Sequence, residues 1–328
     1  WMVFILNNPL ILFVYAYNSF EWHYDDFYPK ADRIYRLTMD MNEGESSMHD
    51  ARLHSAYVDY ITDKVPQVET ITAFTTYGKA IVTIDDQNRF YSNTVFGVDS
   101  NFMQVFNCPL VLGKPEEQFR QPLQLMVSQS SAIRYFGSVD VIGKQVKIQN
   151  QRDESAEVFT INGVFRDFPE NTHFKADWLC SLNKNVSRNL WLYTYIVLSK
   201  DADKMAIEAN IDSLFVQPDF APIFNLQPIT DIHLQSHKTR ELEAGGNQNA
   251  LYLLLFGAIV ILSMALANFF NLNYVQLIKN QTDLIVKRLH GATNRNLLHD
   301  ELIEKLVIIL MAAVISTLIF FGAREAMQ

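Results

Sequence analysis

The sequence predicts an α+β domain outside the cytoplasm, flanked by transmembrane α-helices. Residues 250–270 are 21 apolar-dominated positions, and no charge interrupts residues 244–278. An α-helix rises about 1.5 Å per residue, so roughly 20 residues cross the ~30 Å hydrocarbon core of a bilayer. Residues 1–20 and 306–323 are also apolar, whereas the long middle of the chain mixes strand-like and helix-like polar sequence. Membrane helices at both ends would hold this middle region in solution beside the membrane.

The charge distribution predicts on which side the domain lies. The 328 residues carry a net charge of −9. Residues 274–299 contain four cations and one carboxylate, a net charge of +3, so the remainder carries −12. Because cationic loops beside a span mark the cytoplasmic face, we expect residues 274–299 inside and 21–247 outside. The acidic remainder argues against nucleic-acid binding.

The two cysteines, Cys108 and Cys180, each lie among apolar neighbours. A disulfide in an oxidising compartment is one alternative, but the apolar surroundings favour two buried free thiols. The chain starts at Trp1 without the cationic segment that opens a signal peptide, and it ends directly after an apolar run. We therefore expect a fragment of a longer protein.

Residues 1–20 are an imperfect apolar run, because Asn7, Asn8 and Pro9 interrupt it. Proline lacks an amide hydrogen and disturbs a helix interior. A buried helix of a soluble protein is one interpretation. We favour a truncated first transmembrane helix, since the other end of the domain also leads into a membrane.

The next region begins as a β-α-β-β unit. Alternating apolar residues predict a strand at 33–39, and helical spacing predicts a helix within 54–71 that ends near Pro66. Strands at 80–84 and 90–98 follow, joined by a polar hairpin turn.

Residues 99–190 form a block of short elements. We expect helices or strands over 100–106, 123–127, 128–137, 142–148 and 158–168. The βαβ pattern then resumes with a strand at 191–200, a helix at 201–216 and a strand at 224–234. The simplest architecture is one split α+β domain, residues 33–98 with 191–240, into which a mainly β module, residues 99–190, is inserted.

Two further transmembrane helices are predicted over 248–273 and 300–323, joined by the cytoplasmic segment 274–299. Within this segment, Gly291 suits the position after a helix end, and Thr293 suits the cap of the next helix.

The stretch FGSVDVIGKQ is similar to a phosphate-binding loop only in part. Five residues separate Gly137 from Gly143 where the motif has four, and Gln145 stands where a hydroxyl residue would bind magnesium. We interpret the stretch as a β-turn before a strand, so the chain is not expected to hydrolyse ATP by this loop.

Histidine spacing does not indicate a metal site. His233 and His237 are four residues apart, but they lie in a predicted strand and turn, where this spacing does not bring two imidazoles together. His49 and His54 are no better spaced.

The paired carboxylates Asp25-Asp26, Asp85-Asp86 and Glu116-Glu117 all lie in polar turn contexts, where we expect them to be solvated rather than to act in acid–base catalysis. Glu304 at the mouth of the third span is expected to pair with Lys305. Near the end of the second span, side-chain amides are expected to contact neighbouring helices: Asn268, Asn271 and Asn273. No catalytic constellation emerges, and an enzyme is not predicted.

The stretch EWHYDDFYPKADRIYRL, residues 21–37, resembles the segment just outside the first span of MacB/FtsX-type ABC transporter permeases, particularly the class found in Bacteroidota. The matching residues are Tyr24, Asp25, Phe27, Ala31, Asp32, Arg33, Ile34, Tyr35 and Arg36. VSQSSAIRYFG, FTINGVFRDFPENTHFKAD and LQPITDIHLQS look like later landmarks of the same extracytoplasmic domain. DLIVKRLHGAT is similar to the family's E-I-G-I-R-K-x-x-G-A stretch, with Asp283 for Glu, Ile285 for Gly and Lys287-Arg288 in inverted order.

The resemblance implies a multi-pass permease of the inner membrane with a large periplasmic domain, which combines a split porter-like part and an inserted sabre-like module. It implies a separate ABC ATPase subunit that binds ATP and Mg²⁺, so no cofactor of the chain's own is expected. Further partners implied are a second permease half or a second copy, a periplasmic adaptor and membrane lipid. Such permeases are thought to convert ATP hydrolysis into movement of the periplasmic domain, for export or extraction of a substrate.

On this resemblance, the ATPase-coupling residues are expected to be Asp283, Lys287, Arg288, Gly291 and Ala292. The alternative function is a non-transporting signal transducer in which the same motion activates a periplasmic partner. A two-span sensor with a cytoplasmic output domain is disfavoured, because about thirty residues between the second and third spans leave no room for such a domain. A membrane-anchored enzyme ranks last.

Overall fold

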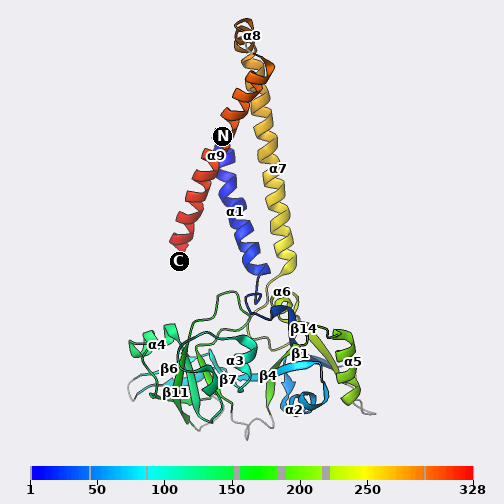
Figure 1. The fold of residues 1–328 in the computed structure, drawn as a ribbon, viewed down its shortest axis with the longest axis vertical. Helices are drawn as coiled ribbons and strands as arrows, with labels where there is room; N and C mark the ends of the chain where they lie inside the picture. The colour runs from blue at the N-terminus through cyan, green and yellow to red at the C-terminus, as the bar shows by residue number, and fades with distance from the viewer. Residues whose placement is uncertain are drawn as a thin grey trace. The chain divides into compact units, whose positions relative to one another are not determined.

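The computed structural model describes residues 2–43, 46–85, 88–150, 156–182, 190–215, 222–291 and 293–327. The chain forms two compact units, one of Trp1–Trp22 with Asn247–Gln328 and the other of His23–Gly246. The first unit is helical, and the second contains a large sheet (Figure 1).

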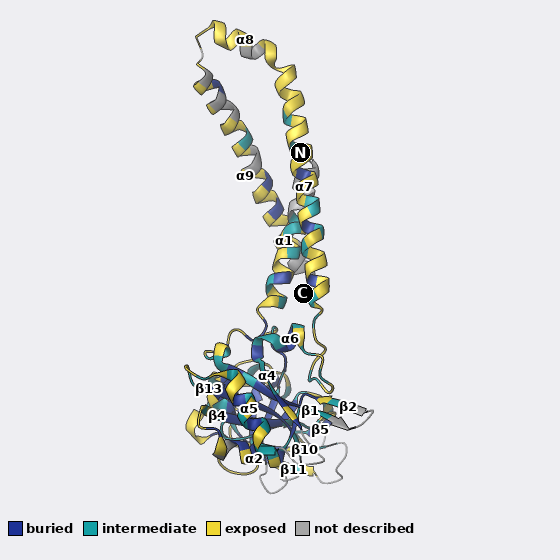
Figure 2. Cartoon of the chain, turned by 90° about the vertical axis from the view of Figure 1, so that its right-hand side faces the viewer, coloured by how far each residue is buried: buried dark blue, intermediate teal, exposed yellow. Residues whose placement is uncertain are grey.

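The helices of the first unit are α1 (Met2–Trp22), α7 (Gln248–Lys279), α8 (Gln281–Leu289) and α9 (Asn294–Met327). Helix α1 packs beside both α7 and α9 (Figure 1). The buried positions of α7 and α9 include the small residues Ala258, Ala265 and Ala312, which let helix backbones approach closely. Most of the large apolar side chains of α7 and α9 are exposed instead (Figure 2). Such a surface suits a lipid environment.

Two described helices, Gln248–Lys279 and Arg295–Ile319, are long and apolar enough to cross a membrane. They coincide with the predicted spans 248–273 and 300–323. The first predicted span lies on α1, which continues unbroken through Pro9. Helix α1 is not one of the two candidates among the described residues, so its crossing of a membrane stays a prediction.

The second unit is built on a mixed sheet of fourteen strands within the described residues. The strands are β1 (Ile34–Glu43), β2 (Ser46–Asp50), β3 (Leu53–His54), β4 (Val68–Thr76), β5 (Ala80–Thr83), β6 (Arg89–Ser92), β7 (Val95–Val98), β8 (Leu110–Leu112), β9 (Gln124–Ser128), β10 (Gln145–Gln149), β11 (Ala156–Phe165), β12 (Trp178–Ser181), β13 (Trp191–Leu198) and β14 (Ile223–Pro228). The main path runs β14-β1-β13-β4-β7-β12-β9-β11-β10-β5-β6, with β2 on β1, β3 on β13 and β8 on β11.

One end of the sheet consists of the antiparallel strands β14, β1, β13 and β4. Helix α2 (Ser55–Lys64) lies between β1 and β4 in the chain, and α5 (Lys204–Phe215) joins β13 to β14. This order is that of a β-α-β-β-α-β unit. Leu37 of β1 packs with Ile61 and Ile207 of the helices. Because side chains alternate along a strand, neighbouring Arg36 points to the opposite face.

An aromatic cluster fills that opposite face around Phe74 of β4. The Phe74 ring stacks on Tyr195 of β13, with ring centroids 5.5 Å apart. Phe102 and Phe106, at the ends of helix α3 (Phe102–Phe106), meet Phe74 edge-on. This packing fixes Tyr195 where its hydroxyl enters the polar cluster described below.

The predicted strand and helix over 123–137 are confirmed as β9 and α4 (Gln129–Phe136). The Ser128 hydroxyl caps α4 by accepting a hydrogen bond from the Ser131 amide at 3.3 Å. Gly137 ends the helix at φ +70°, a conformation that glycine adopts without strain. The FGSVDVIGKQ stretch is therefore a helix end and a turn before β10, as expected.

The predicted end of the second helix near Pro66 is confirmed, because α2 ends at Lys64 and strand β4 begins at Val68. Two other predicted elements were wrong. The predicted strand 90–98 is two strands, β6 and β7, which pair with different partners. The predicted strand 224–234 ends at Pro228, and helix α6 (Ile232–Gln235) follows it.

Both cysteines are free and buried, which confirms the interpretation of two buried thiols. Burial raises the pKa of the Cys108 and Cys180 thiols, so neither forms the reactive thiolate at neutral pH.

We expect a thiol reagent such as Ellman's reagent to leave both unmodified in the native chain and to react with both after unfolding in urea. Rapid labelling of native protein, or a mobility shift on reduction, would contradict this structure.

Candidate functional site

Three segments that are distant in the sequence meet in the second unit. They are the first connector (residues 23–33), which follows α1 in the chain, the loop between β11 and β12, and the second connector (residues 229–246), which precedes α7. Their contacts form what we term the junction cluster: Tyr24, Asp25, Arg36, His173, Tyr195, His233, Ser236 and Glu241. This cluster ties the two ends of the domain to one another.

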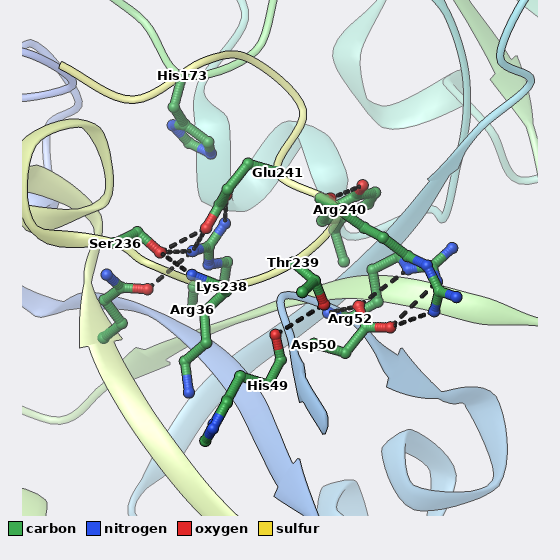
Figure 3. Close-up of polar contacts among 12 residues, drawn as sticks. Arg36, His49, Asp50, Arg52, His173, Ser236, Lys238, Thr239, Arg240 and Glu241 are labelled. Atoms are coloured by element: carbon green, nitrogen blue, oxygen red, sulfur yellow. Dashed lines mark hydrogen bonds and ion pairs between the residues drawn. The ribbon is translucent and has the colours of Figure 1, made fainter. Parts of the chain in front are cut away.

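Arg36 of β1 is fully buried and pairs with Glu241 of the second connector (Figure 3). The two guanidinium Nη atoms donate to the two carboxylate oxygens at 2.5 and 2.7 Å. Nη2 also donates to Gln227 Oε1 at 2.8 Å and to Ser236 Oγ at 3.0 Å, and the Ser236 hydroxyl donates to Glu241. Burial disfavours the charged guanidinium and is the largest single influence on it, but the hydrogen bonds to Glu241, the charge of that carboxylate and the neighbouring Tyr195 together raise the pKa of Arg36. The pair is therefore ionised and held in two-pronged geometry.

Asp25 is also fully buried, at φ +60°, and accepts hydrogen bonds from the loop between β11 and β12. The Thr172 hydroxyl donates to Asp25 Oδ1 at 2.7 Å, and His173 Nδ1 lies 2.8 Å from Oδ2. His173 Nε2 lies 2.6 Å from the Tyr195 hydroxyl. Burial raises the pKa of Tyr195, so its hydroxyl keeps a proton to donate to Nε2, which leaves Nδ1–H to donate to Asp25.

The expectation that Asp25 and Asp26 are both solvated is wrong for Asp25, and only Asp26 is exposed. The left-handed backbone at Asp25 turns its carboxylate inward, where the Thr172 and His173 donors replace water. The contact with His173 spans 148 positions in sequence, so a local pattern could not reveal it.

Tyr24 and His233 join the two connectors through their rings, which stack with centroids 3.5 Å apart and an angle of 6° between planes. The carbonyl of His233 accepts a hydrogen bond from the Gly246 amide at 2.7 Å. A Cβ at Gly245 would lie 3.0 Å from the same carbonyl oxygen, so this close approach favours glycine. His233 thus has a packing role, and the described residues contain no group of three or more metal-ligating side chains.

A second ionic group anchors the second connector to the strand pair β1–β2. Arg52 and Arg240 donate to the fully buried carboxylate of Asp50, at 3.1 Å from Arg52 Nε and 2.6 Å from Arg240 Nη1 (Figure 3). The amide of Thr239 donates to the His49 carbonyl at 2.7 Å. Burial opposes ionisation of Asp50, but the hydrogen bonds from Arg52 and Arg240 outweigh it and lower its pKa.

The other residues matched to the family stretch lie outside the junction cluster. Arg33 donates to Glu69 at 2.7 Å and to the Leu198 carbonyl at 3.0 Å. Phe27 and Asp32 are exposed, and Tyr35 is partly buried against the core beneath α2 and α5. These residues shape the start of β1.

The predicted ATPase-coupling residues lie on and after α8. Lys287 and Arg288 are exposed in its last turn, and Gly291 adopts φ +94° after the helix end, as predicted. The Thr293 hydroxyl accepts a hydrogen bond from the Asn296 amide at 3.3 Å, which confirms the predicted cap of α9. Asp283 belongs to α8, while its side chain and Ala292 lie outside the described residues. The coupling role of these residues stays a prediction.

The fold and the junction cluster together define a class of protein. It has an α+β domain whose two ends contact one another at the points where the chain continues into apolar helices. The family of the MacB-like periplasmic core domain matches residues 10–214, and the chain belongs to this family. This match confirms the family resemblance that the sequence showed.

The solved structures that are similar to the chain include the following three. A domain of a candidate permease protein from Porphyromonas gingivalis is 21% identical over 61% of this chain and 91% of its own, with a TM-score of 0.52, which supports the fold. The periplasmic region of MacB from Actinobacillus actinomycetemcomitans is 17% identical over 57% and 87%, with a TM-score of 0.41. The extracellular domain of the noncanonic ABC-type transporter YknZ from Gram-positive bacteria is 13% identical over 59% and 99%, with a TM-score of 0.43. No curated protein matches the chain.

Replacing Arg36 with Met should strongly destabilise the second unit. The substitution leaves the Glu241 carboxylate without its cation, and breaking a buried pair in this way costs about 3–5 kcal/mol. Urea unfolding of the purified chain, followed by tryptophan fluorescence, measures the change. Lys30→Met is the matched control. Because Lys30 pairs with Glu69 at the surface, this substitution should lower the free energy of unfolding far less than Arg36→Met does. Equal losses for the two variants would contradict the assigned role of Arg36.

The lowered pKa of Asp50 predicts acid sensitivity. In the folded chain, the pKa of Asp50 lies below its unfolded value of about 3.9. The ionised carboxylate therefore stabilises the fold fully above the unfolded pKa, and this stabilisation is lost as the pH falls through the folded-state pKa. We expect Asp50→Asn to lower the unfolding free energy at pH 7 and to flatten its decline below about pH 4. Asp26→Asn, at an exposed site, should leave the pH profile unchanged. A wild-type acid profile in Asp50→Asn would exclude this assignment.

Proposed function

We propose that the chain is the permease subunit of an ABC transporter that turns ATP hydrolysis by a separate subunit into movement of its periplasmic domain, for export or extraction of a substrate. The single observation that carries this proposal is the junction cluster. It fastens the second connector to β1 through the Arg36–Glu241 pair, and it joins the two connectors directly through the stacked rings of Tyr24 and His233. A domain held in this way responds as one body to displacement of the chain at its ends.

The membrane arrangement follows from charge and surface. We place α1, α7 and α9 across the inner membrane, residues 23–246 in the periplasm and residues 274–299 in the cytoplasm. The exposed apolar side chains of α7 and α9 and the +3 charge of the intervening segment support this orientation. Trp22 and Tyr252, with ring centroids 6.4 Å apart, suit the periplasmic interface, where amphipathic rings are favoured.

Within the periplasmic domain we assign residues 33–98 with 191–240, which contain β14, β1, β13 and β4 with α2 and α5, to a porter-like part. The split sequence of this part, broken between β4 and β13, supports the assignment. We assign the mainly β segment 99–190 to a sabre-like module, which continues the same sheet through β7 and β12.

We further propose that the ATPase docks on α8 and its surroundings, at Asp283, Lys287, Arg288, Gly291 and Ala292. The exposed cations of the last turn of α8 offer charge complementarity to the partner. Helix α7 then acts as a rod between this segment and the second connector. ATP and Mg²⁺ belong to the partner, and this chain needs no cofactor of its own.

The rival function is signal transduction, in which the same motion activates a periplasmic partner without transport. Vesicles reconstituted with this chain and its ATPase separate the two functions. Movement of a substrate across or out of the membrane favours transport, whereas ATP-dependent activation of a periplasmic partner without such movement favours transduction.

Reversing both cations of α8, as Lys287→Glu with Arg288→Glu, should abolish co-purification of the ATPase, because it replaces attraction with repulsion at the docking surface. The control is Lys279→Glu with Arg295→Glu, which changes the segment's net charge equally at positions outside α8 and should keep the ATPase bound. Retention of the ATPase by the first variant would refute docking at α8.

A further inference from the structure

A groove of about 680 Å³ lies between α7 and α9, next to the cytoplasmic segment. Its lining is mostly apolar and includes Phe269, Phe270 and Leu306. Three polar side chains, Asn273, Gln276 and Lys305, also line it. A cavity of this size that combines a small polar part with an apolar part fits an amphipathic ligand.

The polar groups form a small site of their own. Lys305 keeps only 20% of its side chain exposed, and its ammonium lies 3.5 Å from Gln276 Oε1 and 3.3 Å from Glu304 Oε1. Glu304 is 64% exposed and is not part of the groove lining, although its carboxylate pairs with the Lys305 ammonium that lines the groove. Asn273 donates from Nδ2 to the Phe269 carbonyl at 2.7 Å. Its Oδ1 is buried and accepts no hydrogen bond from the residues that the structure describes.

The sequence places these groups at headgroup level. The uncharged run of α9, residues 306–323, begins directly after Lys305, and the uncharged run of α7 ends at Ile278. The Gln276–Lys305 contact therefore lies where both helices leave the hydrocarbon. Phe269, Phe270 and Leu306 lie on the hydrocarbon side of that level. A phosphate beside Lys305 would have its acyl chains directed toward these residues.

We propose that this groove binds one anionic phospholipid. Its phosphate pairs with the Lys305 ammonium, and its first acyl methylenes pack on Phe269, Phe270 and Leu306. Charge complementarity selects an anionic lipid, since Lys305 is the single cation of the described lining. The proposal rests on the membrane placement proposed above. In this proposal, the lipid composition of the inner leaflet affects how α7 and α9 pack together, and therefore the position of α8, which joins them.

Native mass spectrometry of the full chain, released from detergent containing equal amounts of phosphatidylglycerol and phosphatidylcholine, tests the proposal. We expect the wild type to retain phosphatidylglycerol over phosphatidylcholine by about fivefold, the effect of one cation near an anionic headgroup. Lys305→Gln should remove this preference and Lys305→Arg should keep it. Lys279→Gln removes an equal charge outside the groove lining and should also keep it.

Different results would contradict the lipid site and the membrane placement. Equal retention of both lipids by the wild type, or an unchanged preference in Lys305→Gln, overturns the lipid site. If a second copy of the chain covers the groove, Leu302→Cys will form a disulfide-linked dimer and Lys305→Gln will not alter lipid retention, which also overturns it. Membrane fractions washed with alkaline carbonate test the membrane placement separately. Release of the chain there contradicts the proposed placement of α7 and α9, whereas membrane retention without a lipid preference contradicts the lipid site alone.

Discussion

The buried guanidinium of Arg36 holds the second connector against the sheet of the periplasmic domain. Arg36 points from β1 into the face of the sheet where the aromatic cluster packs, and a charge in such surroundings is tolerated only when it is paired. Its partner, Glu241, lies 205 residues later in the second connector. The cost of leaving either charge alone keeps the second connector against β1. The Asp50 group and the Tyr24–His233 stack hold the same connector at two further points.

Asp25 gives the first connector an equivalent anchor, through His173 and the Tyr195 hydroxyl. Arg36 and Tyr195 lie opposite one another in the pairing of β1 with β13, so the two anchors meet on neighbouring strands of the sheet. The polar groups at the domain's two ends are thus coupled through contacts that are buried at Asp25, Arg36 and Tyr195 and partly buried at Glu241. In our proposal, this coupling lets displacement of α7 by an ATPase move the sheet as a unit. The anionic lipid site would act at the opposite end of α7.

Much of the fold could be predicted where a local pattern was strong. The β9–α4 pair, β13, and the helix end at Gly291 all follow from alternation, helical spacing or a glycine stop. The errors arose where one apolar stretch covers two elements, as at residues 90–98, which were predicted as one strand but form β6 and β7 with different pairing partners. The junction cluster could not be predicted, because Asp25, His173 and Glu241 are ordinary polar residues until the sheet brings them together. The family resemblance did include Tyr24, Asp25 and Arg36, but as a sequence match rather than as a contact.

The most direct measurement is the distance between the two connectors during the ATPase cycle. Spin labels on Asp32→Cys and His237→Cys, both at exposed positions, report that distance by double electron–electron resonance, since the buried native thiols should stay unlabelled. In the complex of chain and ATPase, a fixed junction predicts one narrow distance distribution that is unchanged between nucleotide-free and ATP-trapped states, and that broadens in Arg36→Met. A second distance that appears with ATP in the wild type would show that the connectors separate, and would contradict movement of the domain as one body.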